Sequence, residues 1–306
     1  MIGAPIVVGV DGSSAATDAA RWAAMWAQRA GRPLRLLSAS ASRERRGLTS
    51  LFVRETAAVL ERHPDLSVDC VHECADASAA LIEASRSAEA VVVGSRGAGG
   101  WEASRIGGVA RDVSAYARCV VAIVPPGESF PPQGPVVVGV DGSPESEEAA
   151  EFAARQACAW RRDLLVVTAY PADGHLASSA ASGQSVATGT TTQTVRTAVV
   201  TPGAAGATGA TGATGTPADE REAAAVAHRG AQVAAEALAA EPAWSGRIEA
   251  RALPGRPALV LADLAAGCSL VVVGARGAGG FAGKLIGATS RAVLEVTNGP
   301  VAVVRA

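Results

Sequence analysis

Short apolar runs alternate with longer amphipathic stretches along this chain. In its first part, runs rich in Val, Ile and Leu occur near residues 6–10, 34–39, 67–72, 90–94 and 119–124. Continuous apolar runs are typical of strands that are covered on both faces, as in parallel sheets. The Ala-rich stretches between them have the spacing of helices. We therefore expect an α/β fold in which five strands alternate with four helices and form an open, doubly wound parallel sheet.

Two local signals support the helical stretches. Ser143 followed by Pro144 is typical of a helix N-cap and the first helical position. Trp22 and Trp26 are four residues apart, which puts both indoles on one face of a helix. We expect these two side chains to pack in the core.

The whole pattern occurs twice, and this repeat sets the domain organisation. Three segments of the first half recur in the second: residues 6–13 as 136–143, residues 91–100 as 271–280, and residues 121–124 as 301–304. The first pair is 130 positions apart and the other two are 180 apart, so the second half holds about 50 additional residues. A Pro-rich junction lies between the halves. We expect two tandem domains of the same fold, residues 1–128 and residues 129–306.

The additional residues lie between Pro171 and about Glu220. They are rich in Ala, Gly, Ser and Thr, and Gly recurs at every third position from Gly203 to Gly215. So few Gly triplets with so little Pro cannot hold a collagen triple helix. Such a composition also buries too little apolar surface to offset the entropy of ordering. We expect a disordered surface insertion.

In a doubly wound sheet, ligands bind beyond the carboxyl ends of the strands, where the strand order reverses. One segment expected there is the turn after the first strand of each half, with Asp11 or Asp141. The other is a glycine-rich loop after the fourth strand, which runs into a helix. Glycines let backbone N–H groups approach a ligand closely, and a helix N-terminus suits phosphate. The second-half loop holds Gly274, Gly277, Gly279, Gly280 and Lys284, followed by Gly287, Thr289 and Ser290.

The loop differs from two common phosphate-binding motifs. A Walker loop ending at Lys284 would need Gly at Ala278 and Ser or Thr at Leu285. The turn after the first strand also lacks the G-x-G-x-x-G pattern of dinucleotide-binding folds.

The chain resembles the universal stress proteins in their tandem two-domain form. Their ATP-binding members share a Gly, two residues, a Gly, nine residues, a Gly, and then Ser or Thr. The spacing is present twice here, as Gly94, Gly97 and Gly107 and as Gly274, Gly277 and Gly287. The resemblance implies the adenine nucleotide α-hydrolase-like fold, a cytoplasmic stress-response role, and ATP with Mg²⁺ as the ligand.

The resemblance also implies roles for individual residues. The Asp of each first turn would contact the ribose or adenine side of the nucleotide, the main chain around Ala39 and Ala169 would line the adenine pocket, and the glycine loops would hold the phosphates. In the first half, the implied nucleotide-binding residues are Gly9, Asp11, Ala39, Gly94, Arg96, Gly97, Gly99, Gly107 and Gly108. In the second half, they are Gly139, Asp141, Ala169, Gly274, Arg276, Gly277, Gly279, Gly280, Gly287, Ala288, Thr289 and Ser290.

Both halves depart from the family pattern after the last Gly. The family has Ser or Thr there, but this chain has Gly108 and Ala288. In the second half Thr289 and Ser290 could supply a hydroxyl, whereas residues 109–110 of the first half are Val and Ala.

A second departure concerns the turn after the third strand. The family's G-x-P turn stands as residues 255–257 in the second half, but residues 75–77 read Ala-Asp-Ala. We therefore expect the second site to be the more intact, and the sequence leaves open whether the first half binds nucleotide.

The composition of the chain argues against nucleic acid and membranes as binding partners. The net charge is −2 and charged residues make up 18% of the chain, so the sequence shows no basic surface for nucleic acid or for an anionic membrane. Aromatic residues make up only 4%, so side chains on which bases could stack are scarce. No uninterrupted apolar stretch has the length of a membrane span. The five Cys follow no disulfide framework, and the first residues have no secretory pattern. We expect a reduced, cytoplasmic protein.

Catalytic and metal chemistry find little support. The four His are scattered, and none pairs with a nucleophile at recognisable spacing. Cys70, His72 and Cys74 would share one side of a strand, but no second ligand pair accompanies them, so we expect packing and surface roles rather than a zinc site. We expect Glu55 on an exposed helix face. No catalytic residue is assigned, and at most slow ATP hydrolysis is expected.

Three functions remain to be compared. We expect an ATP-binding regulatory or stress-response protein with an unidentified protein partner. The alternative is an interaction module that keeps the fold without binding nucleotide, and the missing Ser or Thr favours it. An adenylating enzyme ranks last, because the loop S-G-G-x-D-S is absent after the first strand. Single domains of the resembled family pair through their last strands, so the resemblance also implies that residues 121–124 and 301–304 pair within one chain as a pseudo-dimer and cover each other's edges, with further homodimerisation left open.

Overall fold

The computed structural model describes residues 3–40, 47–97, 106–127, 133–171, 216–239, 241, 244–278 and 286–305. The first half comprises β1 (Ile6–Gly9), α1 (Ser14–Ala30), β2 (Leu34–Ala39), α2 (Leu48–Leu60), β3 (Val68–Glu73), α3 (Ala77–Ala84), β4 (Ala90–Gly94), α4 (Gly108–Tyr116) and β5 (Val120–Val124). The second half comprises β6 (Val136–Gly139), α5 (Pro144–Trp160), β7 (Leu164–Tyr170), α6 (Pro217–Ala237), β8 (Ile248–Pro254), α7 (Pro257–Ala265), β9 (Leu270–Gly274), α8 (Ala288–Val296) and β10 (Val301–Val304).

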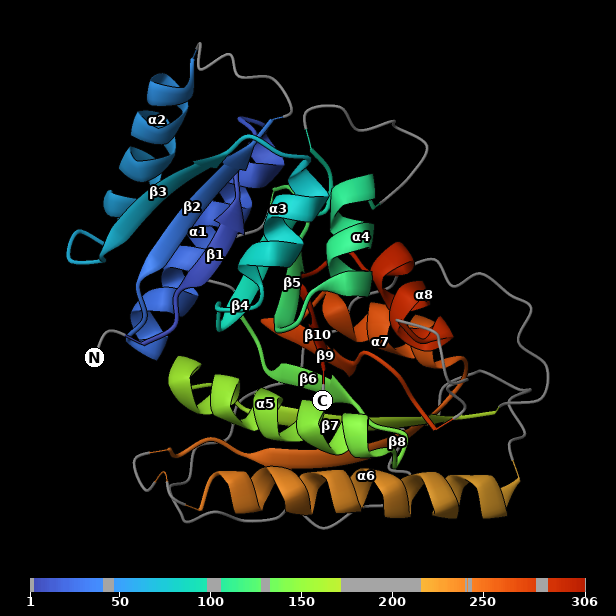
Figure 1. Cartoon of the computed structure of the whole chain (residues 1–306). Coiled ribbons are helices and arrows are strands. Elements are labelled where there is room, and N and C mark those ends of the chain that lie inside the picture. The colour runs from blue at the N-terminus through green and yellow to red at the C-terminus, as the bar shows by residue number, and fades with distance from the viewer. Residues whose placement is uncertain are drawn as a thin grey trace.

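All these strands belong to one continuous sheet, shown in Figure 1. The order is β3-β2-β1-β4-β5-β10-β9-β6-β7-β8. The strands are parallel within each half, and the two halves join where β5 and β10 pair antiparallel. The expected parallel α/β fold is confirmed, with strand bounds within about one residue of those predicted.

The seam between the halves is the strand pairing expected from the sequence. Val301 lies opposite Ile123, and Val303 lies opposite Val121. Because both last strands are paired, neither leaves an open edge at the centre of the molecule.

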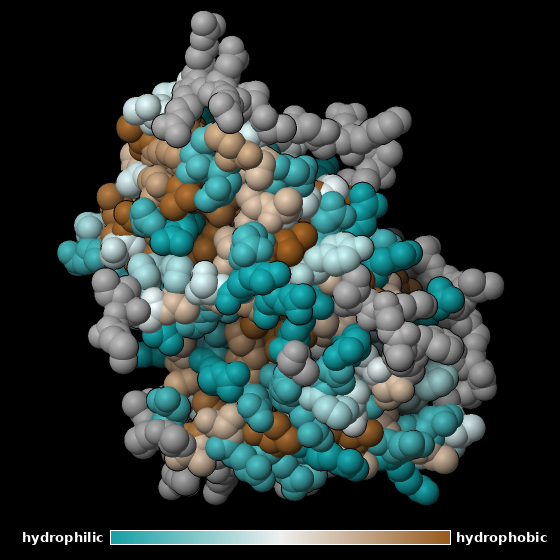
Figure 2. All heavy atoms as spheres, in the orientation of Figure 1, coloured by the Kyte–Doolittle hydropathy of each residue, from teal (hydrophilic) through white to brown (hydrophobic). Residues whose placement is uncertain are grey.

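Helices cover both faces of the sheet and bury two apolar layers. One layer contains side chains of α1, α5 and α6, and the other contains side chains of α3, α4, α7 and α8. Trp22 and Trp26 are buried as expected, with ring centroids 5.4 Å apart. Trp22 also contacts Trp160 of α5 at 5.4 Å, so the indoles join the two halves on this face. In Figure 2, hydrophilic residues cover much of the visible surface and hydrophobic residues form separate patches.

Local capping explains where two helices of the second half begin. The Ser143 hydroxyl accepts a hydrogen bond from the Ser146 N–H at 3.3 Å, and Pro144 opens α5, as expected. The start of α6 was not expected. Thr216 and Asp219 exchange side-chain to backbone hydrogen bonds there as a capping box.

This capping box corrects the C-terminal boundary of the predicted insertion. Residues 217–220 form the first turn of α6 rather than the end of a disordered segment. The rest of the prediction, residues 172–215, lies outside the described residues. The predicted domain boundary at residues 128–129 also lies outside them.

Glu55 of α2 provides a second correction, because its side chain is not exposed. It is 0% exposed and lies where α2 packs against α1. Its carboxylate accepts hydrogen bonds from the Thr17 hydroxyl at 3.1 Å and from the Arg54 guanidinium at 2.8 Å. The local helical pattern could not show this, because the partner Thr17 comes from a different helix.

No helix within the described ranges combines the length and the apolar character that a bilayer crossing requires.

Candidate functional site

The second half has a cavity of about 340 Å³ at the carboxyl ends of β6 and β9. This is the point where the strand order reverses, since β7 lies on one side of β6 and β9 on the other. The residues expected from the sequence that line it are Gly139, Asp141, Ala169, Gly274, Arg276, Gly277, Gly287, Ala288, Thr289 and Ser290.

Asp141 connects the two loops of this cavity. Its Oδ1 accepts hydrogen bonds from the Ser143 N–H at 3.1 Å and the Ser143 hydroxyl at 2.6 Å. Its Oδ2 accepts a hydrogen bond from the Ala278 N–H at 2.9 Å. Burial alone would raise the pKa of Asp141, but the hydrogen bonds from Ser143 and Ala278 outweigh it and lower the pKa below its usual range. The carboxylate is therefore held ionised at the cavity wall.

Gly274, the last residue of β9, and Gly277, in the loop that follows, have different physical roles. A Cβ on Gly277 would collide with Oδ2 of Asp141, so this glycine lets the carboxylate approach the loop. A Cβ on Gly274 would lie 2.9 Å from the backbone oxygen of Glu145, so this glycine lets α5 pack closely against β9. Sequence reasoning assigned both to ligand approach, whereas Gly274 also serves the scaffold.

The N-terminus of α8 faces the same cavity. Gly287 is its N-cap and has no side chain to bond the free backbone N–H groups of the first turn. The buried Ser290 hydroxyl donates to the Gly274 carbonyl at 2.6 Å, so its proton is already engaged. Thr289 is exposed at the cavity, and its side-chain hydroxyl makes no hydrogen bond to another described residue. Of the two expected hydroxyls, Thr289 is the one available to a ligand.

Arg276 contributes the positive charge of this cavity. Its guanidinium lies 2.9 Å from the carboxylate of Glu145 in the first turn of α5. The ion pair restrains an arginine that is about half exposed at the mouth of the cavity.

The first half has a matching cavity of about 330 Å³ at the carboxyl ends of β1 and β4. The expected residues that line it are Gly9, Asp11, Ala39, Gly94, Arg96, Gly97, Gly107 and Gly108. Oδ1 of Asp11 accepts from the Ser13 N–H at 3.0 Å and the Ser13 hydroxyl at 2.6 Å, as in the second half. A Cβ on Gly97 would lie 2.6 Å from Oδ2 of Asp11. The same turn and the same glycine contact are thus built twice.

The side chains around the two cavities differ. Val109 and Ala110 line the first cavity at the places of Thr289 and Ser290. Ala77 stands at the place of Pro257, the last residue of the G-x-P turn.

Several cavity residues were missed by sequence reasoning. Val167, Leu261 and Val273 form apolar wall in the second cavity, and Leu37, Leu81 and Val93 do so in the first. They come from strand ends and from α3 or α7, so only the tertiary arrangement brings them together. Four expected or considered residues, Gly99, Gly279, Gly280 and Lys284, lie outside the described residues.

The described residues contain no group of three or more His, Cys, Asp and Glu that could hold a metal ion. Cys70 and His72 lie on β3 as expected, and Cys70 and Cys74 are exposed. Burial raises the pKa of the Cys119 thiol, next to β5, to about 12.

Comparisons with known proteins agree with this architecture. A model of the universal stress protein family matches residues 4–125 and again residues 134–305. A universal stress protein of Mycobacterium tuberculosis is 30% identical over 329 residues, which cover 98% of this chain and 96% of that protein. The solved structure of a universal stress protein from Archaeoglobus fulgidus has a TM-score of 0.61 at 16% identity, and the match covers 99% of this chain and 97% of that one. Another structure from Archaeoglobus fulgidus, in complex with dAMP, covers 40% of this chain and 98% of its own at 24% identity and a TM-score of 0.34.

Proposed function

Because the chain belongs to the universal stress protein family, with two copies of the family's domain, we propose that it binds ATP and acts as a nucleotide-dependent regulator. The proposal places it in the cytoplasm, where ATP is available and thiols stay reduced. A protein partner would bind selectively to the nucleotide-bound state. The second-half cavity is the principal site.

The observation that carries this proposal is the duplicated cavity. Each half places an Asp turn, a glycine loop and a helix N-terminus around a hollow of about 330–340 Å³ at the point where the strand order reverses. Ligand pockets span roughly 300–1,000 Å³, and this position in the sheet is where open α/β folds bind ligands. A loop that only turned a strand into a helix would not need the Asp contact in both halves.

The lining of the second cavity fits an adenine nucleotide. Val167 and Ala169 offer an apolar wall suited to a base, and Asp141 offers carboxylate oxygens suited to ribose hydroxyls. The first-turn N–H groups of α8 and the guanidinium of Arg276 suit phosphates. We propose that Mg²⁺ enters bound to the phosphates, since Mg²⁺ in nucleotide sites usually keeps phosphate and water ligands.

The proposal is for binding and regulation rather than fast turnover. The described residues lining the two cavities include no His, Glu or Lys. The carboxylates of Asp11 and Asp141 already accept hydrogen bonds within their own turns. Among the described residues that line the two cavities, none is therefore a free general base.

Thermal unfolding with and without Mg-ATP tests the proposal, using Gly277→Val and Gly97→Val as paired variants. ATP at 100 times its Kd should add about 2.7 kcal/mol of stability, a shift of several degrees. We expect Gly277→Val to remove most of the shift and Gly97→Val to remove less. Unfolding without ATP controls for loss of stability by the variants themselves.

A second function is supported by one observation. Gly108 and Ala288 replace the hydroxyl residue expected after the last glycine, and the proton of Ser290 is used by the Gly274 carbonyl. These features favour an interaction module that has kept the fold without the ligand. The absence of any shift at millimolar Mg-ATP, in protein purified free of nucleotide, would favour this second function.

A further inference from the structure

Helix α2 of the first half is held to the rest of the molecule in an unusual way. Its buried side chains are those of Val59 and Glu55. A helix normally docks through an apolar stripe. Besides the apolar contacts of Val59 and of the partly buried Leu51 and Phe52, a fully buried carboxylate lies in the contact with α1, so the position of α2 also depends on the polar partners of Glu55.

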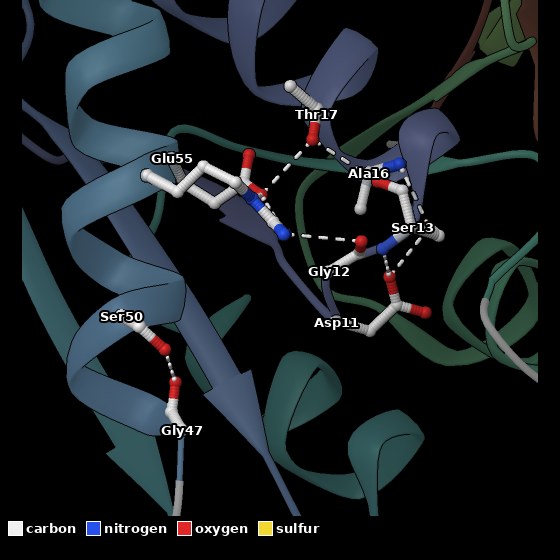
Figure 3. A network of polar contacts seen from close by, with 9 residues as sticks. Asp11, Gly12, Ser13, Ala16, Thr17, Gly47, Ser50 and Glu55 are labelled. Atoms are coloured by element: carbon white, nitrogen blue, oxygen red, sulfur yellow. Dashed lines mark hydrogen bonds and ion pairs between the residues drawn. The ribbon is translucent and has the colours of Figure 1, made fainter.

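These partners connect α2 to the start of α1, as Figure 3 shows. Oε1 of Glu55 accepts a hydrogen bond from the Thr17 hydroxyl at 3.1 Å (Figure 3). It also accepts hydrogen bonds from Nη2 and Nε of Arg54 at 2.8 and 3.2 Å. The Thr17 hydroxyl also lies 3.2 Å from the carbonyl of Ser13, the residue that bonds Asp11. Oε2 of Glu55 is buried with no hydrogen-bond partner among the described residues.

Arg54 extends the connection to the turn of the first cavity. Its Nη2 donates to the Gly12 carbonyl at 3.1 Å. Gly12 has φ of +88°, a left-handed conformation that favours glycine, and follows Asp11 directly. One guanidinium therefore bonds both a buried carboxylate on α2 and the turn that carries the cavity's Asp.

The described part of the second half has a different arrangement at this place. Gly142 has the same conformation, with φ of +81°, but faces Val226 of α6. Helix α6 is held by small apolar side chains, since its buried residues are Ala223, Ala227, Gly230, Ala231 and Ala234. Within the described residues, the polar connection is thus found in the first half only.

A buried carboxylate with one unbonded oxygen is a costly way to dock a helix, and apolar packing would often serve stability as well or better. We propose that Arg54 and Glu55 form a polar latch that couples the docking of α2 to the position of the Asp11 turn. Arg54 is then a positioning residue of the first cavity. The nucleotide part of this inference rests on the proposed function, whereas the latch itself does not.

Coupling of this kind is reciprocal. If the latch holds the Asp11 turn in its binding position, breaking it weakens ligand binding at the first cavity. Ligand binding there in turn stabilises the docked position of α2. The second cavity, in the same molecule, serves as the internal reference.

Hydrogen exchange of the ligand-free protein tests the latch without any nucleotide. In Arg54→Ala, we expect amides of residues 11–17 and 48–60 to exchange about three- to tenfold faster, the effect of losing a hydrogen bond of typical net strength. Residues 141–147 should be unchanged. Arg86→Ala, which breaks an exposed ion pair with Glu83, is the matched control and should change neither segment. Unchanged exchange of residues 11–17 in Arg54→Ala overturns the latch.

Calorimetric titration with Mg-ATP tests the coupling. In a Gly277→Val background, which leaves the first cavity as the binding site, Arg54→Ala should weaken binding about three- to tenfold. In a Gly97→Val background the same change should have no effect on the second cavity. Arg54→Lys keeps the charge but loses the planar fork, so it should restore binding only in part.

The two experiments distinguish a failure of the coupling from a failure of the proposed function. Faster exchange with unchanged affinity at the first cavity would overturn the coupling. If the unmodified chain binds no ATP at all, the proposed function fails, while the exchange experiment still decides the latch. If Arg54→Ala does not fold, the double variant Arg54→Ala with Glu55→Gln, which leaves no unpaired buried charge, replaces it in both experiments.

Discussion

The two halves of this chain share a backbone scaffold and differ in the side chains that face the cavities. Both cavities have nearly the same volume, about 340 and 330 Å³, and the same Asp turn against the same loop glycine. Around that frame, the second half has Thr289 and an Arg276–Glu145 ion pair, while the first half has Val109 and the polar connection through Arg54. Duplication has thus kept what builds the cavity, whereas the groups that would recognise a ligand have diverged.

The seam shows the same kind of asymmetry. Arg305, just after β10, donates a hydrogen bond to the backbone carbonyl of Ser114 in the other half. At the corresponding place after β5 stands Pro125, which has no side-chain donor. At this seam, a symmetric strand pairing is therefore accompanied by an asymmetric side-chain contact.

The largest expected effect is a loss of stability when the glycines that let a helix pack closely against a strand in each half are replaced. A Cβ at Gly274 or Gly94 would lie 2.9 Å from backbone atoms of α5 or α1. We expect Gly274→Ala and Gly94→Ala each to lower the free energy of unfolding by roughly 1–3 kcal/mol, because the helix must move. Denaturant unfolding measures this. Gly267→Ala, which adds a methyl group in open space, is the control. Unequal losses at the two glycines would show that the scaffold is less symmetric than it looks.

The next effect concerns the hydroxyl at the helix N-terminus. Thr289→Val should weaken Mg-ATP binding at the second cavity by up to about tenfold, since a typical hydrogen bond contributes roughly 0.5–1.5 kcal/mol and about 1.4 kcal/mol corresponds to a factor of ten. The reciprocal change, Val109→Thr, should strengthen binding at the first. Titration calorimetry of both variants decides this, with Val53→Thr, at an exposed position of α2, as the matched control. If neither substitution changes the affinity for Mg-ATP, backbone groups alone hold the phosphates.

A smaller effect is expected at the seam. Arg305→Ala removes a hydrogen bond between the halves and should cost on the order of 1 kcal/mol in unfolding free energy. Arg291→Ala, which breaks an exposed pair with Glu295, should cost less than about 0.5 kcal/mol. If Arg305→Ala and Arg291→Ala lower the free energy of unfolding equally, the Arg305 contact does not strengthen the seam.

The smallest expected effect is a pH dependence set by Asp141. Its pKa in the folded chain lies below the ordinary value of 3.8, because the hydrogen bonds from Ser143 and Ala278 outweigh burial. Its ionisation therefore favours folding above that ordinary value, and this contribution is lost as the pH falls through the lower folded pKa. Asp141→Asn should show a flatter loss of stability on acidification, and Ser143→Ala an intermediate one. Unfolding free energies measured from neutral to acidic pH test this, and a profile of Asp141→Asn parallel to that of the unmodified chain would contradict it.

Several features of the fold follow from local sequence. The Val-rich runs predicted the strands, because a strand buried on both faces needs continuous apolar residues over a short length. Repetition of those runs predicted two copies of one fold, and the glycine spacing with Asp11 and Asp141 placed the cavities. Apolar wall residues such as Leu81 and Leu261 were missed, since a helical Leu gives no local sign of which strand end it will face.

The sequence by itself determined the strands, their repetition, and the Asp turns and glycine loops at the strand ends, because each of these is a short pattern of neighbouring residues. Folding then brings each Asp turn against its glycine loop. Only the tertiary structure decided that Glu55 is buried, that Gly274 serves helix packing and that Ser290 bonds a carbonyl of the neighbouring strand. It also decided that Arg54 bonds the turn at Gly12. The physical reason is the same in each case: burial and hydrogen bonding of a side chain are set by partners that folding brings from distant parts of the chain.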